Sequence, residues 1–206
     1  MEKYDYIFAG TGLAALMAVY EMVLSQKFKD KKILLIDADL KKTNDRTWCF
    51  WEKPDGRHES LVHKKWKIAI FSNEKQTRDL DLDPYRYKMI RGLDFYNHVF
   101  NIISKEVNIS FSNQKIIDFQ ETENQVIVKT EAESYSCSKL FNSLFNPEEV
   151  LLQDKYPLLQ QHFIGWKIRS PKPAFTPEKA TFMDFSVAQK GNTRFMYVLP
   201  FSKTEA

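Results

Sequence analysis

The order of apolar and polar stretches at the start of the chain predicts a strand, a turn, a helix and a second strand. Residues 3–9 are mostly apolar or aromatic and predict a buried strand. The turn Gly10-Thr-Gly-Leu-Ala-Ala15 follows without a spacer. Apolar residues then recur at the spacing of a helix, at Leu13, Leu16, Met17, Tyr20, Val23, Leu24 and Phe28. Residues 31–37 predict a second strand, which ends in an acid, Asp37.

After Asp37 the pattern changes to short strands separated by polar turns. A polar loop over 38–44 leads to an abrupt cluster of aromatic residues at 46–51, and one helix is expected at 93–105. The apolar runs that predict strands cover 64–71, 85–91, 107–111, 115–119, 125–129, 133–137 and 138–145. The three successive runs from 115 to 137 predict a β-meander.

The chain becomes rich in proline after residue 145, and this change marks a domain boundary. Strand candidates persist at 163–169, 180–187 and 193–201. We therefore expect a cofactor-binding region at 1–150, with an inserted segment at about 45–90, and part of an antiparallel substrate-domain sheet at 151–206.

The glycine turn has the residue types that a bound dinucleotide requires. Gly10 allows the tight turn, Gly12 lets the backbone approach a pyrophosphate, and Ala15 keeps the helix close to the sheet. The N–H groups at the start of the helix can bind the phosphates, and Asp37 can accept a hydrogen bond from a ribose hydroxyl. The alternative is a glycine turn that binds nothing, but the strand, helix and strand around this turn favour dinucleotide binding.

The elements that follow Asp37 distinguish between dinucleotide cofactors. A dehydrogenase that binds NAD would continue with further strand–helix units. This chain continues with an insertion, one helix and a meander. By analogy, the arrangement resembles the FAD domain of the glutathione-reductase type. We therefore predict an α/β fold of the Rossmann-like FAD-binding type, with FAD rather than NAD as the cofactor.

Composition narrows the class of protein further. Of the 206 residues 43% are hydrophobic and 28% are charged, which is typical of a soluble globular protein, and the net charge of +3 is too small to indicate nucleic acid. The distant Cys49 and Cys137 indicate reduced thiols and a cytoplasmic protein, and the four histidines show no metal spacing. No apolar run approaches the roughly 18 residues of a membrane span. We expect no signal peptide, transit peptide or earlier domain.

Four strings along the chain are similar to signatures of flavin-dependent lycopene cyclases. Asn44–Trp51 resembles an Arg/His-Thr-Trp-x-Phe signature, and Gln160–Trp166 resembles Gln-x-Phe-x-Gly-Trp. Residues 182–200 resemble a block with Met-Asp-Phe, a glutamine and Phe-x-Tyr-x-Leu-Pro, and Tyr87–Arg91 with Phe95 fits the central strand and helix of the family. The resemblance covers essentially the whole chain and points to the N-terminal half of a bacterial lycopene beta-cyclase.

The resemblance implies a cyclisation with no net oxidation or reduction. A proton is placed on a terminal double bond of lycopene, the carbocation closes a ring, and a proton is lost. This needs an acid kept protonated in an apolar cavity and negative charge near the cation. The family is understood to use reduced FAD for the second role, with NADPH as the source of electrons. Because lycopene dissolves in the bilayer, the resemblance also implies peripheral membrane contact, and it implies no nucleic acid.

The resemblance also assigns roles to residues. Cofactor binding is implied for Gly10, Gly12, Leu13, Ala14, Ala15, Asp37 and Arg91. Substrate contact is implied for Trp48, Phe50 and Trp51, although these aromatic residues could equally form core. Asp184 lies between two apolar residues, so burial would raise its pKa and suit it to acid–base catalysis, unless it faces solvent. Arg91 is either a group near the flavin or a surface cation.

Members of this family run to nearly twice the length of this chain. Their acid-rich catalytic motif follows a stretch seen here as residues 199–206, so we expect the main catalytic acid beyond Ala206, and Glu205 outside the motif. We therefore expect a truncated chain without the C-terminal half of the family. Two alternatives remain open: a redox FAD-dependent oxidoreductase or monooxygenase, and a flavin-binding fragment that is catalytically incomplete.

Overall fold

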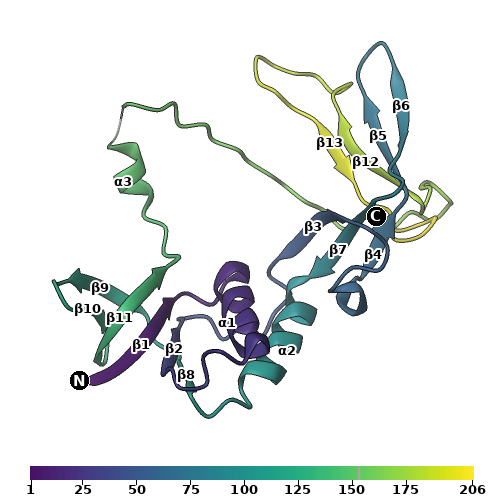
Figure 1. Ribbon diagram of the computed structural model, residues 1–206. Coiled ribbons are helices and arrows are strands. Elements are labelled where there is room, and N and C mark those ends of the chain that lie inside the picture. Colours follow the sequence, from purple (N-terminus) through teal and green to yellow (C-terminus); the bar gives the residue numbers. More distant parts are fainter. Residues whose placement is uncertain (153) are drawn as a thin grey trace. The chain divides into compact units, whose positions relative to one another are not determined.

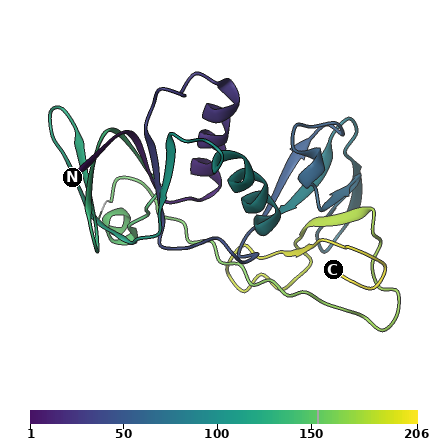
Figure 2. The ribbon, with the colours of Figure 1, turned by 90° about the horizontal axis from the view of Figure 1, so that it is seen from below.

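A computed structural model describes residues 1–152 and 154–206 (Figures 1 and 2). The chain forms two compact units. The first unit comprises Met1–Thr43 and Phe95–Gln160, and the second unit comprises Asn44–Asp94 and Gln161–Ala206.

The first unit is built on a six-stranded sheet with the strand order β8-β2-β1-β11-β10-β9. Its strands are β1 (Glu2–Ala9), β2 (Ile33–Ile36), β8 (Ile109–Ser112), β9 (Ile116–Glu121), β10 (Val126–Thr130) and β11 (Ser134–Asn142). The strands β8, β2, β1 and β11 are mutually parallel, and β10 and β9 continue the sheet in antiparallel fashion. The parallel part and the meander predicted from the sequence are thus parts of one sheet.

Both faces of the parallel strands are covered, which explains why all four residues of β2 are apolar and buried. The helices α1 (Leu13–Ser25) and α2 (Gly92–Ile103) lie on one side of the sheet, and a short helix, α3 (Pro147–Leu151), follows β11 (Figure 1). On the other face, Leu34 and Ile36 of β2 pack with Val128 and Tyr135 of the meander. Helices on one side of a mainly parallel sheet, which the meander continues, confirm the predicted α/β fold class.

The sequence prediction was wrong about how the meander ends. Residues 133–137 and 138–145 were expected to be separate strands, but Ser134–Asn142 is one continuous strand. The reason is that its first half pairs with two neighbours at once. Ser136 and Cys137 pair antiparallel with β10 on one side and parallel with β1 on the other. This double pairing leaves no place for a turn at residue 138.

The second unit contains two small sheets. One has the order β3-β7-β4 and the other has the order β13-β12-β5-β6. Their strands are β3 (Thr47–Glu52), β4 (Lys64–Trp66), β5 (Ile68–Ser72), β6 (Thr77–Asp81), β7 (Arg86–Arg91), β12 (Lys179–Asp184) and β13 (Met196–Val198). Both sheets contribute to a core in which Trp66, Tyr87, Met89 and Ala180 are buried.

Several predicted strands of the second unit differ from those observed. The run at 64–71 divides into β4 and β5, because the chain passes from one sheet to the other at Lys67. Of the segment 163–169, only Arg169 forms a bridge, to Glu205. The strand predicted at 180–187 is observed at Lys179–Asp184, and the strand predicted at 193–201 is observed only at Met196–Val198. The sheet is also not purely antiparallel, since β12 pairs parallel with β5.

The pairing of β12 with β5 also determines which segments belong together. Ala180 lies opposite Ala69, so the chain after residue 160 shares a sheet with the segment expected to be an insertion at about 45–90. The boundaries of the compact units therefore differ from the expected boundary at residue 150, since residues 44–94 group with 161–206.

Candidate functional site

The turn between β1 and α1 requires glycine at its first position. Gly10 has a φ of +94°, a conformation that side chains rarely adopt, and its N–H donates to the carbonyl of Ile36 at 2.8 Å. A Cβ atom on Gly10 would collide with the hydroxyl of Ser143. Gly10 therefore supplies the tight turn that was predicted, and Ser143 sets how closely the neighbouring loop approaches it.

The N-terminus of α1 is open to a ligand. Gly12 is the N-cap residue, and among the described side chains none caps the helix and none in its first turn is acidic. A Cβ atom on Gly12 would meet nothing within 4 Å, and Leu13 and Ala14 are exposed. The N–H groups of a helix start have no partner within the helix, and they attract anions. This turn therefore fits a pyrophosphate.

Asp37 follows β2 and is hydrogen-bonded to the glycine turn. Its Oδ2 accepts from the N–H of Thr11 at 2.6 Å and from the Thr11 hydroxyl at 2.8 Å, and its Oδ1 accepts from the N–H of Asp39 at 2.8 Å. A carboxylate offers about four acceptor positions. One position on Oδ1 therefore remains for a ribose hydroxyl, and the side chain is 18% exposed.

The charge of Asp37 is also fixed by these contacts. Burial alone would raise its pKa, but the hydrogen bonds from Asp39 and Thr11, with the nearby ammonium of Lys41, lower the pKa below its ordinary value. Asp37 is thus ionised at neutral pH, which suits it to accept a hydrogen bond.

The glycine turn lies where the strand order of the sheet reverses. The strands β2 and β11 lie on either side of β1, so the carboxyl ends of β1 and β11 form the switch point at which such sheets bind ligands. Ser143, directly after β11, donates from its N–H at 3.0 Å and from its hydroxyl at 2.6 Å to the carbonyl of Ala9. Sequence reasoning missed Ser143. The available signal was a pair of polar residues, Asn142 and Ser143, after an apolar strand.

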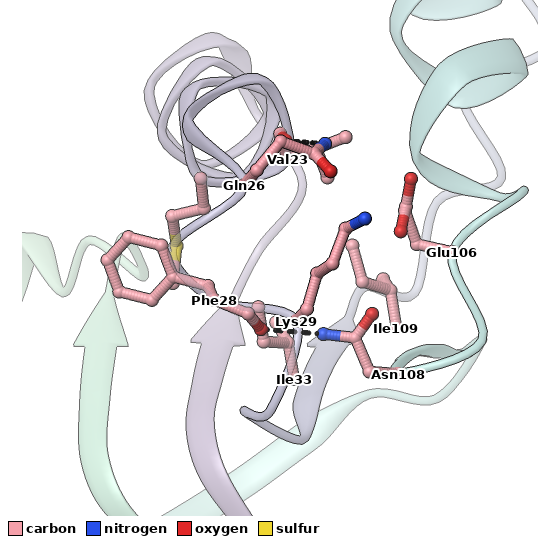
Figure 3. A pocket seen from close by; sticks show the side chains of 9 residues that line it. Val23, Gln26, Phe28, Lys29, Ile33, Glu106, Asn108 and Ile109 are labelled. Atoms are coloured by element: carbon pink, nitrogen blue, oxygen red, sulfur yellow. Dashed lines mark hydrogen bonds between the residues drawn. The ribbon is translucent and has the colours of Figure 1, made fainter.

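The pocket in Figure 3 lies at the opposite end of the sheet. It is bounded by the end of α1 and by the first residues of β2 and β8, and Asn108 there donates to the carbonyl of Phe28 at 2.9 Å. Its volume is about 10 Å³, the room of a single water molecule. It is too small for a cofactor.

Arg91 lies in the second unit, at the end of β7. Its guanidinium forms hydrogen bonds of 2.7 and 3.1 Å to the carboxylate of Asp94, and it is partly exposed. The side chain is therefore held by a surface ion pair. Its role in cofactor binding stays a prediction.

The three aromatic residues expected to form one wall do not share a face of β3. Trp51 lies opposite Tyr87, whereas Phe50 lies opposite Lys88 and Trp48 lies opposite Ile90. Because side chains alternate along a strand, Trp51 lies on one face and Trp48 and Phe50 on the other. Substrate contact by these residues stays a prediction, but the structure separates them into two environments.

Trp51 belongs instead to a group of four rings that we call the aromatic cluster: Trp51, Tyr87, Phe182 and Tyr197. The ring of Trp51 is 4.4 Å from that of Tyr87 and 5.4 Å from that of Phe182, and the Phe182 and Tyr197 rings are 6.2 Å apart. The hydroxyls of Tyr87 and Tyr197 are 2.6 Å apart. Sequence reasoning missed the two tyrosines, which lie far apart along the chain.

The polar groups of the aromatic cluster are neutral. Burial raises the pKa of Tyr87 to about 12, and burial with the hydrogen bond to Tyr87 raises the pKa of Tyr197. Burial also raises the pKa of the neighbouring Cys49 thiol. Two phenols and a thiol therefore keep their protons at neutral pH.

Asp184 has the opposite electrostatic environment to the one expected. It is the last residue of β12 and only partly buried, and its Oδ1 accepts from the N–H of Ser186 at 2.9 Å. The hydroxyl and N–H of Ser186 lower its pKa, so the predicted increase was wrong. Asp184 is ionised at neutral pH and is a poor proton donor there, and a catalytic role for it stays a prediction.

Lys88 is a buried cation that sequence reasoning missed. Its Nζ lies 3.0 Å from Glu52 Oε2 and 2.5 Å from Glu59 Oε2, and it donates to the carbonyls of Lys53 and Pro54. Burial opposes the charge, but the hydrogen bonds with Glu59 and Glu52 outweigh it and raise the pKa of Lys88. All four acceptors belong to one strand end and its loop, so this group holds the loop after β3 against β7.

Two further observations concern the described residues, 1–152 and 154–206. Within these ranges no group of three or more histidine, cysteine, aspartate or glutamate side chains could hold a metal ion. No helix in the same ranges is long and apolar enough to cross a membrane.

The solved structures similar to this chain include an FAD-dependent monooxygenase and a halogenase that has been solved with FAD. PqsL from Pseudomonas aeruginosa, described as a probable FAD-dependent monooxygenase, is 11% identical with a TM-score of 0.55, covering 87% of this chain and 54% of that one. The halogenase PltM is 14% identical with a TM-score of 0.53, covering 72% of this chain and 36% of that one. The chain thus spans about half or less of these structures, and the likeness shows a Rossmann-like FAD-binding fold.

The sequence profile described as "Lycopene cyclase protein" matches residues 5–206. A comparison with curated proteins finds no match. The match to the profile confirms the resemblance predicted from the four strings.

Proposed function

Because the chain belongs to the lycopene cyclase family, we propose that it takes part in the flavin-dependent cyclisation of lycopene end groups. A proton adds to a terminal double bond, the carbocation closes a ring, and a neighbouring carbon loses a proton, so the product is an isomer and no electrons are consumed. The match to the lycopene cyclase profile carries the proposal, and the open N-terminus of α1 at the switch point of the sheet supports its flavin part.

FAD is the proposed cofactor, and the first unit would hold its adenosine diphosphate half. The pyrophosphate would lie against Gly12 and the first N–H groups of α1, at Leu13, Ala14 and Ala15. The remaining acceptor position of Asp37 would bind a ribose hydroxyl, and Arg91 is a proposed contact near the flavin. When bound and reduced, with NADPH as the source of electrons, FAD would supply negative charge near the carbocation.

Asp184 is better suited to the final loss of a proton than to the initial protonation of the double bond. An ionised carboxylate can accept the proton that the ring-closed cation loses, but it cannot donate the first proton. Asp184→Asn should therefore slow product formation more than Asp184→Glu does. Equal activities of the two variants in a product assay would rule out this role.

Lycopene itself calls for contact with a membrane. The side chains of Phe163, Ile164 and Trp166 are 72–89% exposed, which supports peripheral contact of a cytoplasmic protein with the bilayer. Sedimentation with vesicles of neutral and anionic lipid would test this. If the chain stays in the supernatant with both, peripheral contact is excluded.

A second candidate is a flavin-binding chain that needs another polypeptide for catalysis. It is favoured by the length of the match, since the chain covers only 36% of PltM and 54% of PqsL. A redox flavoenzyme is the third reading, and its products would carry oxygen or be saturated.

Two measurements separate these functions. The purified chain should take up FAD and show flavin absorbance after gel filtration; a folded, colourless chain would contradict the cofactor proposal. In bacteria that accumulate lycopene, expression of the chain should yield cyclised isomers of unchanged mass. Soluble, flavin-loaded protein with unchanged lycopene would favour the second candidate, and oxygenated or saturated products would favour the third.

A further inference from the structure

The aromatic cluster brings four rings together from four strands, β3, β7, β12 and β13. Tyr87 is 6% exposed and forms its floor, whereas Trp51 and Tyr197 are 45% and 39% exposed. Phe182 contacts all three other rings. Part of each outer ring is therefore accessible to a ligand, and the floor beneath them is fixed.

The contacts within the cluster explain why the rings hold their positions. Trp51 and Tyr87 are paired across neighbouring strands, and the hydroxyl of Tyr87 is hydrogen-bonded to that of Tyr197. Trp66, fully buried below, has its indole N–H hydrogen-bonded to the carbonyl of Pro200 at 3.0 Å. A ligand would thus meet aromatic surfaces that are already ordered.

The chemistry of the cluster suits an apolar group that becomes a cation. Aromatic faces attract positive charge through their quadrupoles. The polar groups that belong to the cluster, the hydroxyls of Tyr87 and Tyr197 and the thiol of Cys49, are neutral, so they neither form an ion pair with a cation nor remove a proton from it early. A carboxylate in the same place would form an ion pair with the cation, and a neutral amine would remove a proton from it.

We propose that the aromatic cluster binds the acyclic end group of an isoprenoid polyene and stabilises its cationic form against the faces of Trp51, Phe182 and Tyr197. This inference rests on the proposed function and names the part of the chain that meets the reacting end of the substrate. Of the three aromatic residues of β3, it is therefore Trp51, and not Trp48 or Phe50, that faces this end group.

The inference can be tested by binding, without turnover. The probe is an acyclic isoprenoid tertiary amine, protonated at neutral pH as a mimic of the carbocation, compared with the neutral hydrocarbon of the same skeleton. Trp51→Leu keeps an apolar side chain and removes the ring, and it should weaken binding of the ammonium probe about three- to fivefold, as expected for a cation–π contact at a partly exposed site. Trp51→Phe should lose less affinity for the ammonium probe than Trp51→Leu does. In both variants, the affinity for the neutral probe should change less than the affinity for the ammonium probe.

The matched control is Tyr85→Leu, which removes a 48% exposed ring outside the cluster. It should leave both affinities unchanged; equal losses in the two leucine variants would mean non-specific adsorption and overturn the inference. Absence of binding to the natural chain, or unchanged binding by Trp51→Leu, would also overturn it. If Trp51→Leu fails to fold, Phe182→Leu replaces it. Flavin uptake and product analysis test the proposed function separately. Binding of the probe without cyclisation of lycopene would therefore refute the proposed function and leave the inference about the aromatic cluster standing.

Discussion

The carboxylate of Asp37 accepts two hydrogen bonds from Thr11, at 2.6 Å from the backbone N–H and at 2.8 Å from the hydroxyl. Thr11 is the residue between the two glycines of the turn, and it is 4% exposed. The link joins the end of β2 to the start of α1. It therefore fixes the carboxylate proposed to bind a ribose relative to the helix N-terminus proposed to bind the pyrophosphate.

Thr11→Val removes the hydroxyl and keeps the shape of the side chain. We expect it to lower the free energy of unfolding by about 1–2 kcal/mol, because a partly buried carboxylate loses one of its donors. The measurement is urea unfolding at neutral pH. Thr11→Ser retains the hydroxyl and should cost less than half as much; equal losses in the two variants would mean that the hydroxyl does not hold Asp37.

The lowered pKa of Asp37 predicts how stability depends on pH. Its folded-state pKa lies below the ordinary value of 3.8. The stability that Asp37 contributes is therefore fully present above about pH 5 and is lost as the pH falls through 3.8 towards the folded-state pKa. Between about pH 6 and pH 3, the natural chain should lose more stability than Asp37→Asn. Parallel curves for the two proteins, measured by urea unfolding, would contradict this assignment.

Local patterns predicted the start of the first unit well and the pairing of the second unit poorly. The turn at Gly10, the buried run of β2 and the helical spacing of α1 are signals within a few residues. The second unit depends on pairing between distant segments, such as Ala69 with Ala180, which no local pattern reveals. The strand β6 is exposed at every position and has no apolar alternation to mark it.

The candidate site follows the same division. Gly10, Gly12 and Asp37 lie together because β1 and β2 are successive strands that pair side by side in the sheet. The pairing of Tyr87 with Tyr197 could not be foreseen, because it joins strands of different sheets. The error at Asp184 was avoidable. A serine two residues after an aspartate can donate to the carboxylate in a turn, and such a turn lowers the pKa.

The buried ammonium of Lys88 makes a prediction about the second unit. Lys88→Met leaves Glu52 without its cation and leaves Glu59 paired with Lys65 alone, and we expect a loss of about 2–3 kcal/mol, less than for a fully buried pair because both carboxylates can regain water. The double variant Lys88→Met with Glu52→Gln should recover part of the loss, because it removes the carboxylate that is left unpaired. Urea unfolding of the single and double variants checks this; no recovery would mean that packing of the lysine stem, rather than charge, holds the loop.

The two glycines of the turn should respond differently to the same substitution. Gly10→Ala places a Cβ against the Ser143 hydroxyl at a φ of +94°, so we expect a loss of about 1–3 kcal/mol in the free energy of unfolding. Gly12 has a φ of −73° and open space around its Cβ, so Gly12→Ala should leave stability within about 0.5 kcal/mol of the natural chain. Its new methyl group would lie where the pyrophosphate is proposed to bind, and FAD affinity should fall at least about tenfold. Flavin titration of a stable Gly12→Ala chain with unchanged affinity would place the cofactor elsewhere, because the space beside Gly12 would then be unused.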